Sequence, residues 1–297
     1  MEQLCNGLPD KPVGVTVGTF DGVHVGHRLV VDYLHKLCEE NGLHPVVVTF
    51  QPHPLSVIDP KRAPKLLDLP EDRIRLLQSL GVEVRMLEFD ENLRRHTAEQ
   101  WLERLADKGT RILVVGYDNT FGSDGMSMNI SDYRRLGAKY GIDVYEAPIL
   151  PGISSSAIRR ELGAGKVDKV AEMLGHRYSV TGVVEHGKEL GRRLGFPTAN
   201  ISVDSSITLP APGVYAADAI TPDGKSFRAV VNIGVAPSVK KGLPLSVEAH
   251  LIDFDGDLYG QKLKVEFIRY LRDEHKFETL DRLKEAISND IRTAQAL

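Results

Sequence analysis

The sequence predicts an α/β domain with a doubly wound parallel sheet, followed by a small antiparallel β-barrel that ends in a helix. Three observations indicate this arrangement. The 297 residues fit two domains of ordinary size. The first half alternates β-branched runs with segments of helical spacing. After Tyr178, short strands follow one another with turn residues between them. We therefore expect domains at residues 1–176 and 177–297.

The first half contains five segments with the character of strands, at residues 13–17, 45–50, 82–87, 112–115 and 142–145. Residues 45–50 form a continuous apolar run, as expected for a strand that is buried on both faces. Helical spacing predicts helices over 28–37, 74–80 and 130–140 and two short helices within 154–175. A capping box at Thr97 and Gln100 predicts a helix that runs to about residue 108. This alternation of strands and helices favours a parallel sheet.

The second half contains strand-like segments at residues 178–184, 213–220, 227–233, 246–252 and 263–270. Turn residues at 222–224, 241–242 and 255–256 separate them, and five or six strands at this spacing indicate a small barrel. Residues 279–294 form an amphipathic pattern that predicts a closing helix.

Composition narrows the classes of protein and partner. Hydrophobic residues make up 42% and charged residues 26%, which is ordinary for a globular chain. The net charge is −4 and neither half is basic, which argues against nucleic acid or an anionic membrane as a partner. There is no run of 18 apolar residues and no signal-peptide pattern, so we expect a cytoplasmic protein. Two cysteines form no disulfide framework, and the oligomeric state stays open.

The sharpest local pattern runs from Gly18 to His27, between a predicted strand and a predicted helix. Ligands of open α/β sheets bind beyond the carboxyl ends of the strands, and a helix N-terminus there favours anions. Gly22 and Gly26 would let the backbone approach a phosphate closely. His24 and His27 are three residues apart, so both imidazoles can donate to a polyphosphate. The alternatives are a metal site, for which no local carboxylate or cysteine completes the set, and a histidine pair without a role.

The HxGH pattern in this turn resembles the HIGH-type nucleotidyltransferases, and the full GTFDGVHVGH resembles the adenylyltransferase module of prokaryotic bifunctional riboflavin kinase/FAD synthetases. Three further segments resemble that module: TFQPHP at 49–54, GYDNTFG at 116–122 and ISSSAIR at 153–159. Ser156 stands where the family usually has threonine, which keeps the hydroxyl. The resemblance implies a Rossmann-like N-terminal domain.

The second half resembles the riboflavin kinase of the same family through GVVEHG at 182–187 and GRRLGFPTAN at 191–200. The segments 232–234, 247–251 and 253–260, together with Arg272 and Phe277, continue the match in the family's order. One departure is the segment from Lys188 to Gly191, where the family often has an acidic-then-basic, glycine-rich turn. This departure raises the alternative of an FAD synthetase with a weakened kinase half. A non-catalytic flavin-binding regulator is a second alternative.

The resemblance implies two ATP-dependent reactions: riboflavin becomes FMN in the barrel, and FMN becomes FAD with release of pyrophosphate in the first domain. Riboflavin, FMN and ATP are then the partners, with Mg²⁺ as the metal ion.

The resemblance also implies which residues act. The implied catalytic residues are Glu248, as the base that accepts the riboflavin hydroxyl proton, and His24, His27 and Arg159. Mg²⁺ would be held by Thr198 and Asn200. Nucleotide and phosphate contacts are implied for Gly18, Phe20, Asp21, Gly22, Gly26, Asp118, Ser155, Ser156, Gly187 and Gly195. Flavin contacts are implied for His53, Asp257, Tyr259 and Arg272.

Without the resemblance, several of these residues have ordinary interpretations. Residues 197–200 read as a turn, and Glu248 reads as an exposed strand carboxylate. The aspartates at 253, 255 and 257 suggest an EF-hand loop, but Lys264 occupies position twelve, where that loop needs glutamate.

Overall fold

A computed structural model describes residues 11–116, 121–187, 191, 194–235, 245–275 and 277–297. The chain divides into two compact units, Met1–Ser154 and Ser155–Leu297. Strands and helices alternate up to α8, which ends at Leu174, and the strands of the second half begin after it. The sequence places the change of pattern in the same region. The compact units divide earlier, because the two helices that follow Ser154 pack with the barrel.

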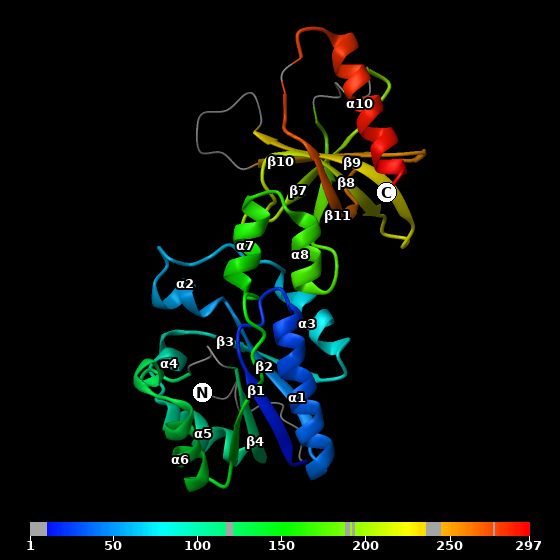
Figure 1. Cartoon of the computed structure of the whole chain (residues 1–297). Coiled ribbons are helices and arrows are strands. Elements are labelled where there is room, and N and C mark those ends of the chain that lie inside the picture. The colour runs from blue at the N-terminus through cyan, green and yellow to red at the C-terminus, as the bar shows by residue number, and fades with distance from the viewer. Residues whose placement is uncertain (1–10, 117–120, 188–190, 192–193, 236–244, 276) are drawn as a thin grey trace. The chain divides into compact units, whose positions relative to one another are not determined.

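The first unit contains a five-stranded parallel sheet in the order β3-β2-β1-β4-β5 (Figure 1). Every neighbouring pair is parallel, which confirms the predicted sheet. The strands are β1 (Val13–Val17), β2 (His44–Gln51), β3 (Glu83–Glu88), β4 (Thr110–Val115) and β5 (Asp143–Glu146).

Helices cover both faces of this sheet. On one face, α1 (Val25–Asn41) and α3 (Pro70–Gln78) pack through Val31 and Leu77 against Val47 of β2. On the other face, α5 (Ala98–Asp107) and α6 (Ile130–Lys139) bury Trp101 and Tyr133 in a second core. The capping box at the start of α5 is confirmed. Three short elements were not predicted: α2 (Pro54–Ile58), α4 (Glu91–Arg94) and a 3₁₀ turn, η1 (Gly125–Ser127).

The second unit is a closed, six-stranded antiparallel barrel in the order β10-β7-β6-β11-β8-β9. The predicted barrel is therefore confirmed, with one strand more than the five segments singled out in the sequence. The strands are β6 (Ser179–Glu185), β7 (Ala199–Val203), β8 (Gly213–Ile220), β9 (Ser226–Val235), β10 (Leu245–Leu251) and β11 (Lys262–Arg272). The unpredicted strand is β7, whose sequence reads as the continuation of a turn.

Three of the helices whose residues are fully described accompany the barrel. The C-terminal helix α10 (Leu280–Gln295) was predicted and packs on β8 and β9 (Figure 1). In this contact Ala294 and Ile291 share a hydrophobic cluster with Val214 and Val230. The predicted pair of short helices is α7 (Ser155–Gly163) and α8 (Val167–Leu174), and α8 packs on β11. Gly175 ends α8 in the left-handed conformation, with φ of +73°.

Candidate active sites

In the first unit, the carboxyl ends of three neighbouring strands carry the predicted nucleotide segments. Strand β1 lies between β2 and β4, so the direction of chain winding reverses beside it. Ligands of open α/β sheets bind at such a switch point. The Gly18–His24 turn follows β1, the Gln51–Pro54 segment follows β2, and Gly116 follows β4. Asp118 lies outside the described residues.

The two histidines of the turn lie in contact. His24 is the N-cap of α1 rather than part of its first turn, and its Nδ1 accepts a hydrogen bond from the His27 backbone N–H at 3.2 Å. The two imidazole rings stack with centroids 3.5 Å apart. A Cβ at Gly26 would lie 3.1 Å from Nδ1 of His24, so this glycine leaves room for the capping ring. The spacing of the HxGH pattern therefore builds a paired-imidazole helix start.

His27 is held neutral in this position. Burial lowers the pKa of His27 well below its usual value, and the neighbouring His24 and Arg73 lower it further. Its Nδ1 is buried and has no hydrogen-bond partner among the described residues. A neutral imidazole offers one N–H donor. His27 is thus suited to hydrogen bonding to a phosphate oxygen rather than to supplying a charge.

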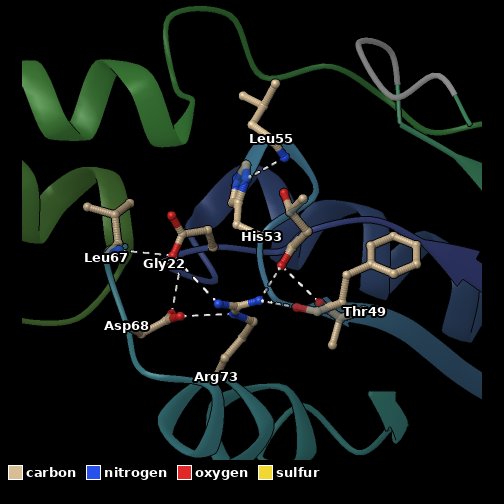
Figure 2. A network of polar contacts seen from close by, with 10 residues as sticks. Gly22, Thr49, His53, Leu55, Leu67, Asp68 and Arg73 are labelled. Atoms are coloured by element: carbon tan, nitrogen blue, oxygen red, sulfur yellow. Dashed lines mark hydrogen bonds and ion pairs between the residues drawn. The ribbon is translucent and has the colours of Figure 1, made fainter. Parts of the chain in front are cut away.

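A buried polar network lies beneath the turn (Figure 2). The Gly22 N–H donates to Asp68 Oδ2 at 2.8 Å, and the Leu67 N–H donates to Asp21 Oδ1 at 2.9 Å. The Arg73 guanidinium bonds to Asp68 Oδ1 through Nε at 3.0 Å. The predicted residues Asp21 and Gly22 therefore take part in holding the turn, and their contact with a nucleotide stays a prediction.

Asp68 and Arg73 were missed in the sequence. The available signal was an aspartate between two leucines, just before a proline that begins a helix, with an arginine one helical turn later. A carboxylate flanked by apolar residues is a candidate for burial, and buried charges occur in pairs. That pattern points to an ion pair but does not say what the pair supports.

His53 caps the short helix α2 after β2. Its Nδ1 accepts from the Leu55 backbone N–H at 3.2 Å, and its carbonyl accepts from the Ser56 hydroxyl at 2.7 Å. The bond from the Leu55 N–H orients the ring, and the bond from Ser56 holds the backbone of the cap. The contact of His53 with flavin stays a prediction.

Ser155, Ser156 and Arg159 lie in the first turns of α7, within the second compact unit. Ser155 and Arg159 are four residues apart and share one face of the helix. Ser156 is exposed, whereas Ser155 and Arg159 are partly buried. A helix N-terminus with hydroxyls and an arginine suits an anion, and the assignment of these residues to ATP phosphates stays a prediction.

In the barrel, strand register brings Glu248 between two amides. Glu248 of β10 is paired with Asn200 of β7 on one side and with Asn232 of β9 on the other. Its neighbours Val247 and Ala249 are buried in the barrel, so Glu248 and both asparagines lie on the outer face. Side chains of directly opposite residues have Cβ atoms about 5 Å apart. The barrel therefore presents a carboxylate flanked by two hydrogen-bonding amides.

Asn200, Glu248 and Asn232 form a row on the outer face of the barrel. The loop segments beside this row approach it closely. A Cβ at Gly187 would lie 2.1 Å from Nδ2 of Asn200, so a larger residue there would displace the Asn200 amide from this position. A Cβ at Gly191 would lie 2.4 Å from the carbonyl oxygen of Phe196, whose N–H donates to the Gly191 carbonyl at 2.8 Å. Gly195 has φ of +89°, which also favours glycine. Of the atypical segment noted in the sequence, residues 188–190 lie outside the described residues.

The donors of this row fit Mg²⁺ in kind. The Thr198 hydroxyl and the Asn200 amide oxygen are hard ligands two residues apart at the start of β7. No group of three His, Cys, Asp or Glu side chains suited to a metal occurs in the part of the chain that the structure describes. Mg²⁺ usually keeps several waters and takes further ligands from substrate phosphates, so it needs few ligands from the protein.

The predicted flavin residues of the barrel are held by their own neighbours. Asp257 Oδ1 accepts from the Tyr259 N–H at 2.9 Å, and the Tyr259 ring stacks on His186 with centroids 3.8 Å apart. Arg272 donates from Nη2 to Asp290 Oδ2 at 2.8 Å and from Nη1 to the Asp273 carbonyl at 3.0 Å. The sequence did not reveal Asp290 as this partner. The contacts of Asp257, Tyr259 and Arg272 with flavin stay predictions.

Comparison with known proteins finds one family for each half of the chain. Residues 9–159 match the family described as FAD synthetase, and residues 174–297 match the family described as riboflavin kinase. The bifunctional riboflavin kinase/FMN adenylyltransferase of Escherichia coli (strain K12) is 34% identical over 97% of this chain and 93% of its own length. The protein of the same name from Bacillus subtilis (strain 168) is 35% identical over 93% of this chain and 89% of its own length. The chain belongs to the bifunctional riboflavin kinase/FMN adenylyltransferase family.

A solved structure supports the fold over the whole length. A crystal structure described as a macrolide-efflux protein from Streptococcus pneumoniae superposes with a TM-score of 0.90 and 28% identity, covering 100% of this chain and 98% of that one. That description applies to the Streptococcus protein. Among the described residues of this chain, no helix is long and apolar enough to cross a membrane. As a member of the riboflavin kinase/FMN adenylyltransferase family, the chain is a transferase that forms FMN and FAD.

Proposed function

We propose that riboflavin is phosphorylated at the outer row of the barrel, with Glu248 as the general base. The observation that carries this proposal is the register that sets Glu248 between Asn200 and Asn232. The ribityl hydroxyl of riboflavin is a weak nucleophile until its proton is removed. Glu248 accepts that proton as the oxygen bonds to the γ-phosphorus of ATP, and ADP leaves. The register places the Asn200 and Asn232 side chains on either side of this carboxylate, and the Asn232 amide also donates to Glu274 Oε1 at 3.3 Å.

The close loops form the nucleotide side of this kinase site. Gly187 and Gly195 let the backbone approach ATP, and Asp257, Tyr259 and Arg272 contact the flavin side. Thr198 and Asn200 would hold Mg²⁺, which supplies positive charge to the transferring phosphates when it is bound. The kinase domain spans residues 177–297 in this proposal.

FMN adenylylation belongs to the turn after β1 in the domain of residues 1–176. An FMN phosphate oxygen attacks the α-phosphorus of ATP, the bond to the β-phosphate oxygen breaks, and pyrophosphate leaves. The nucleophile is already an anion, so positioning and charge stabilisation suffice. His24 and His27 act as hydrogen-bond donors, His27 as a neutral imidazole; the start of α1 favours the phosphates, and Arg159 supplies a permanent charge.

The other predicted residues support this second reaction. Gly18, Phe20, Asp21, Gly22 and Gly26 shape the turn that receives the nucleotide, and His53 contacts FMN. Ser155, Ser156 and Asp118 contact ATP. The partners are small molecules rather than nucleic acid, and the enzyme works in the cytoplasm.

Two variants separate the reactions. With riboflavin, ATP and Mg²⁺, the wild-type chain should give FMN and then FAD by chromatography. Glu248→Gln should form no FMN from riboflavin but should convert supplied FMN to FAD. His27→Ala should accumulate FMN without FAD. Glu266→Gln and His44→Ala, which change partly exposed side chains on other strands, should behave as the wild type.

The outcomes also decide between alternatives. Loss of both reactions in folded Glu248→Gln would refute separate sites. FAD from supplied FMN but no FMN from riboflavin in the wild type would show a weakened kinase half. Binding of flavin without either product would show a regulator.

A further inference from the structure

The turn that begins α1 has a backbone that cannot hold its shape unaided. Phe20 and Val23 have φ of +49° and +38°, and Gly22 has φ of +86°. The left-handed region is unfavourable for residues other than glycine, and most of all for a β-branched residue such as valine. Such a conformation persists only where its surroundings determine it.

Hydrogen bonds from outside the turn hold it in this conformation. The Thr19 carbonyl accepts from Arg73 Nη1 at 3.1 Å and from the Thr49 hydroxyl at 2.9 Å. The Gly22 N–H donates to Asp68 Oδ2 at 2.8 Å. Figure 2 shows Arg73 reaching from α3 to a position between Asp68 and Thr49. The turn is thus held on both sides of Phe20.

Arg73 also reaches a second segment. Its Nη1 donates to the Phe50 carbonyl at 3.2 Å, just before the Gln51–Pro54 segment that carries His53. The same side chain therefore bonds to the ends of β1 and β2. Lysine cannot make these contacts together with the Nε bond to Asp68, because its single ammonium lacks the planar fork of a guanidinium.

Arg73 and its two carboxylate partners, Asp21 and Asp68, are buried inside the first domain. The exposed fraction is 1% for Arg73, 0% for Asp21 and 8% for Asp68. Two carboxylates face one guanidinium, with Arg73 Nη2 4.0 Å from Asp21 Oδ1. Buried charges of this kind need paired and hydrogen-bonded surroundings. An apolar side chain could fill the same space but could not hold the two carbonyls.

We infer that Arg73, oriented by Asp68, is a positioning residue for FAD formation, because its guanidinium fixes the turn after β1 relative to the segment after β2. This inference rests on the proposed function of those two segments, in which the turn binds ATP phosphates and His53 contacts FMN. Arg73 is buried beneath them and acts through the backbone. Small displacements of binding groups reduce rates strongly in reactions that depend on positioning.

The test compares Arg73→Lys with Arg75→Lys, which changes an exposed arginine on the same helix. We expect Arg73→Lys to lower kcat/KM for FAD formation by roughly tenfold or more and to raise KM for both ATP and FMN. Asp68→Asn should raise KM for ATP more than KM for FMN, because Asp68 bonds directly to the Gly22 N–H of the turn but reaches the segment after β2 only through Arg73. Arg75→Lys should match the wild type.

Two internal readouts distinguish positioning from unfolding. The single tryptophan, Trp101, is buried in the first unit, so its fluorescence reports the fold of that unit. FMN formation in the barrel measures the amount of competent chain. Native Trp101 emission with FAD kinetics within twofold of the wild type in Arg73→Lys would overturn the inference.

If Arg73→Lys loses the native emission, Asp68→Asn decides by the same criterion. Its loss of FAD formation with native emission would support the inference, and unchanged kinetics would overturn it. Failure of the wild type to form FAD would instead refute the proposed function.

Discussion

Two glycines show how single residues shape the two sites. Gly26 leaves the space in which the His24 ring caps α1, and Gly187 leaves the space in which the loop after β6 approaches Asn200. In both places the close approach depends on the absence of a Cβ. A Cβ would lie 3.1 Å from His24 Nδ1 at Gly26 and 2.1 Å from Asn200 Nδ2 at Gly187. The glycines of these sequence motifs are therefore required for the packing of polar side chains as well as for the predicted contacts with a nucleotide.

Asp68 should make the stability of the first unit depend on pH. Burial and, to a smaller extent, the neighbouring Asp21 raise the pKa of Asp68 to about 7, although Arg73 opposes the change. Between the usual carboxyl pKa and this value, the folded state holds a proton that the unfolded state has released. The free energy of unfolding should then fall as pH rises, by up to about 1.4 kcal/mol per pH unit from this group.

Asp68→Asn isolates this effect. The lowered pKa of His27 acts in the opposite direction near its usual range, but it is common to both proteins. We expect the wild type to lose stability relative to Asp68→Asn between pH 5 and 7, measured by urea unfolding of Trp101 fluorescence. Parallel pH profiles would contradict the assigned ionisation.

At the scale of elements, strand register decides which side chains can act. Glu248 faces outward because Val247 and Ala249 face into the barrel. A shift of one residue would turn Glu248 inward and separate it from Asn200 and Asn232. The pairing of β10 with both β7 and β9 therefore fixes the proposed base.

The ion pair between β11 and α10 should stabilise the barrel. Arg272 donates to both carboxylate oxygens of Asp290, which is 6% exposed. Asp290→Ala leaves this guanidinium without its acid and should cost about 3 kcal/mol. The measurement is the urea concentration at which FMN formation is lost. Glu278→Ala breaks an exposed pair with Arg282 beside the same helix and should leave that midpoint unchanged; an equal shift in both variants would contradict the prediction.

The sequence predicted the elements whose patterns are local. The five parallel strands and helix α10 follow from hydrophobic spacing, and Thr97 marks the start of α5 through its own hydrogen bonds. Strand β7 was missed because its start, after Pro197, has the composition of a turn, and only pairing with β6 and β10 makes it a strand. The contacts of Asp68 with Gly22 and of Arg272 with Asp290 join residues 46 and 18 positions apart. Such pairs depend on the folded topology, so no local pattern reveals them.

For the whole molecule, a net charge of −4 coexists with two proposed sites for anionic substrates. In the proposed sites the positive character is local, and it would come from the start of α1, from Arg159 on α7 and from Mg²⁺ at Thr198 and Asn200. The net charge of the chain therefore argues against a polyanionic partner, whereas a small anion can be bound by a few local groups in the right positions. The same separation applies to stability, because each compact unit has its own hydrophobic core.

We expect core mutations to affect mainly the reaction of their own unit. Leu105 is fully buried beside Trp101, and Leu105→Ala should destabilise the first unit by about 2–5 kcal/mol. Trp101 emission and FAD formation should then be lost at lower urea, while FMN formation keeps its midpoint. Phe267→Leu, which removes a fully buried ring between Tyr178 and Tyr215, is the reciprocal control and should lower only the midpoint of FMN formation. If both activities shift together in both variants, the two cores unfold as one cooperative system.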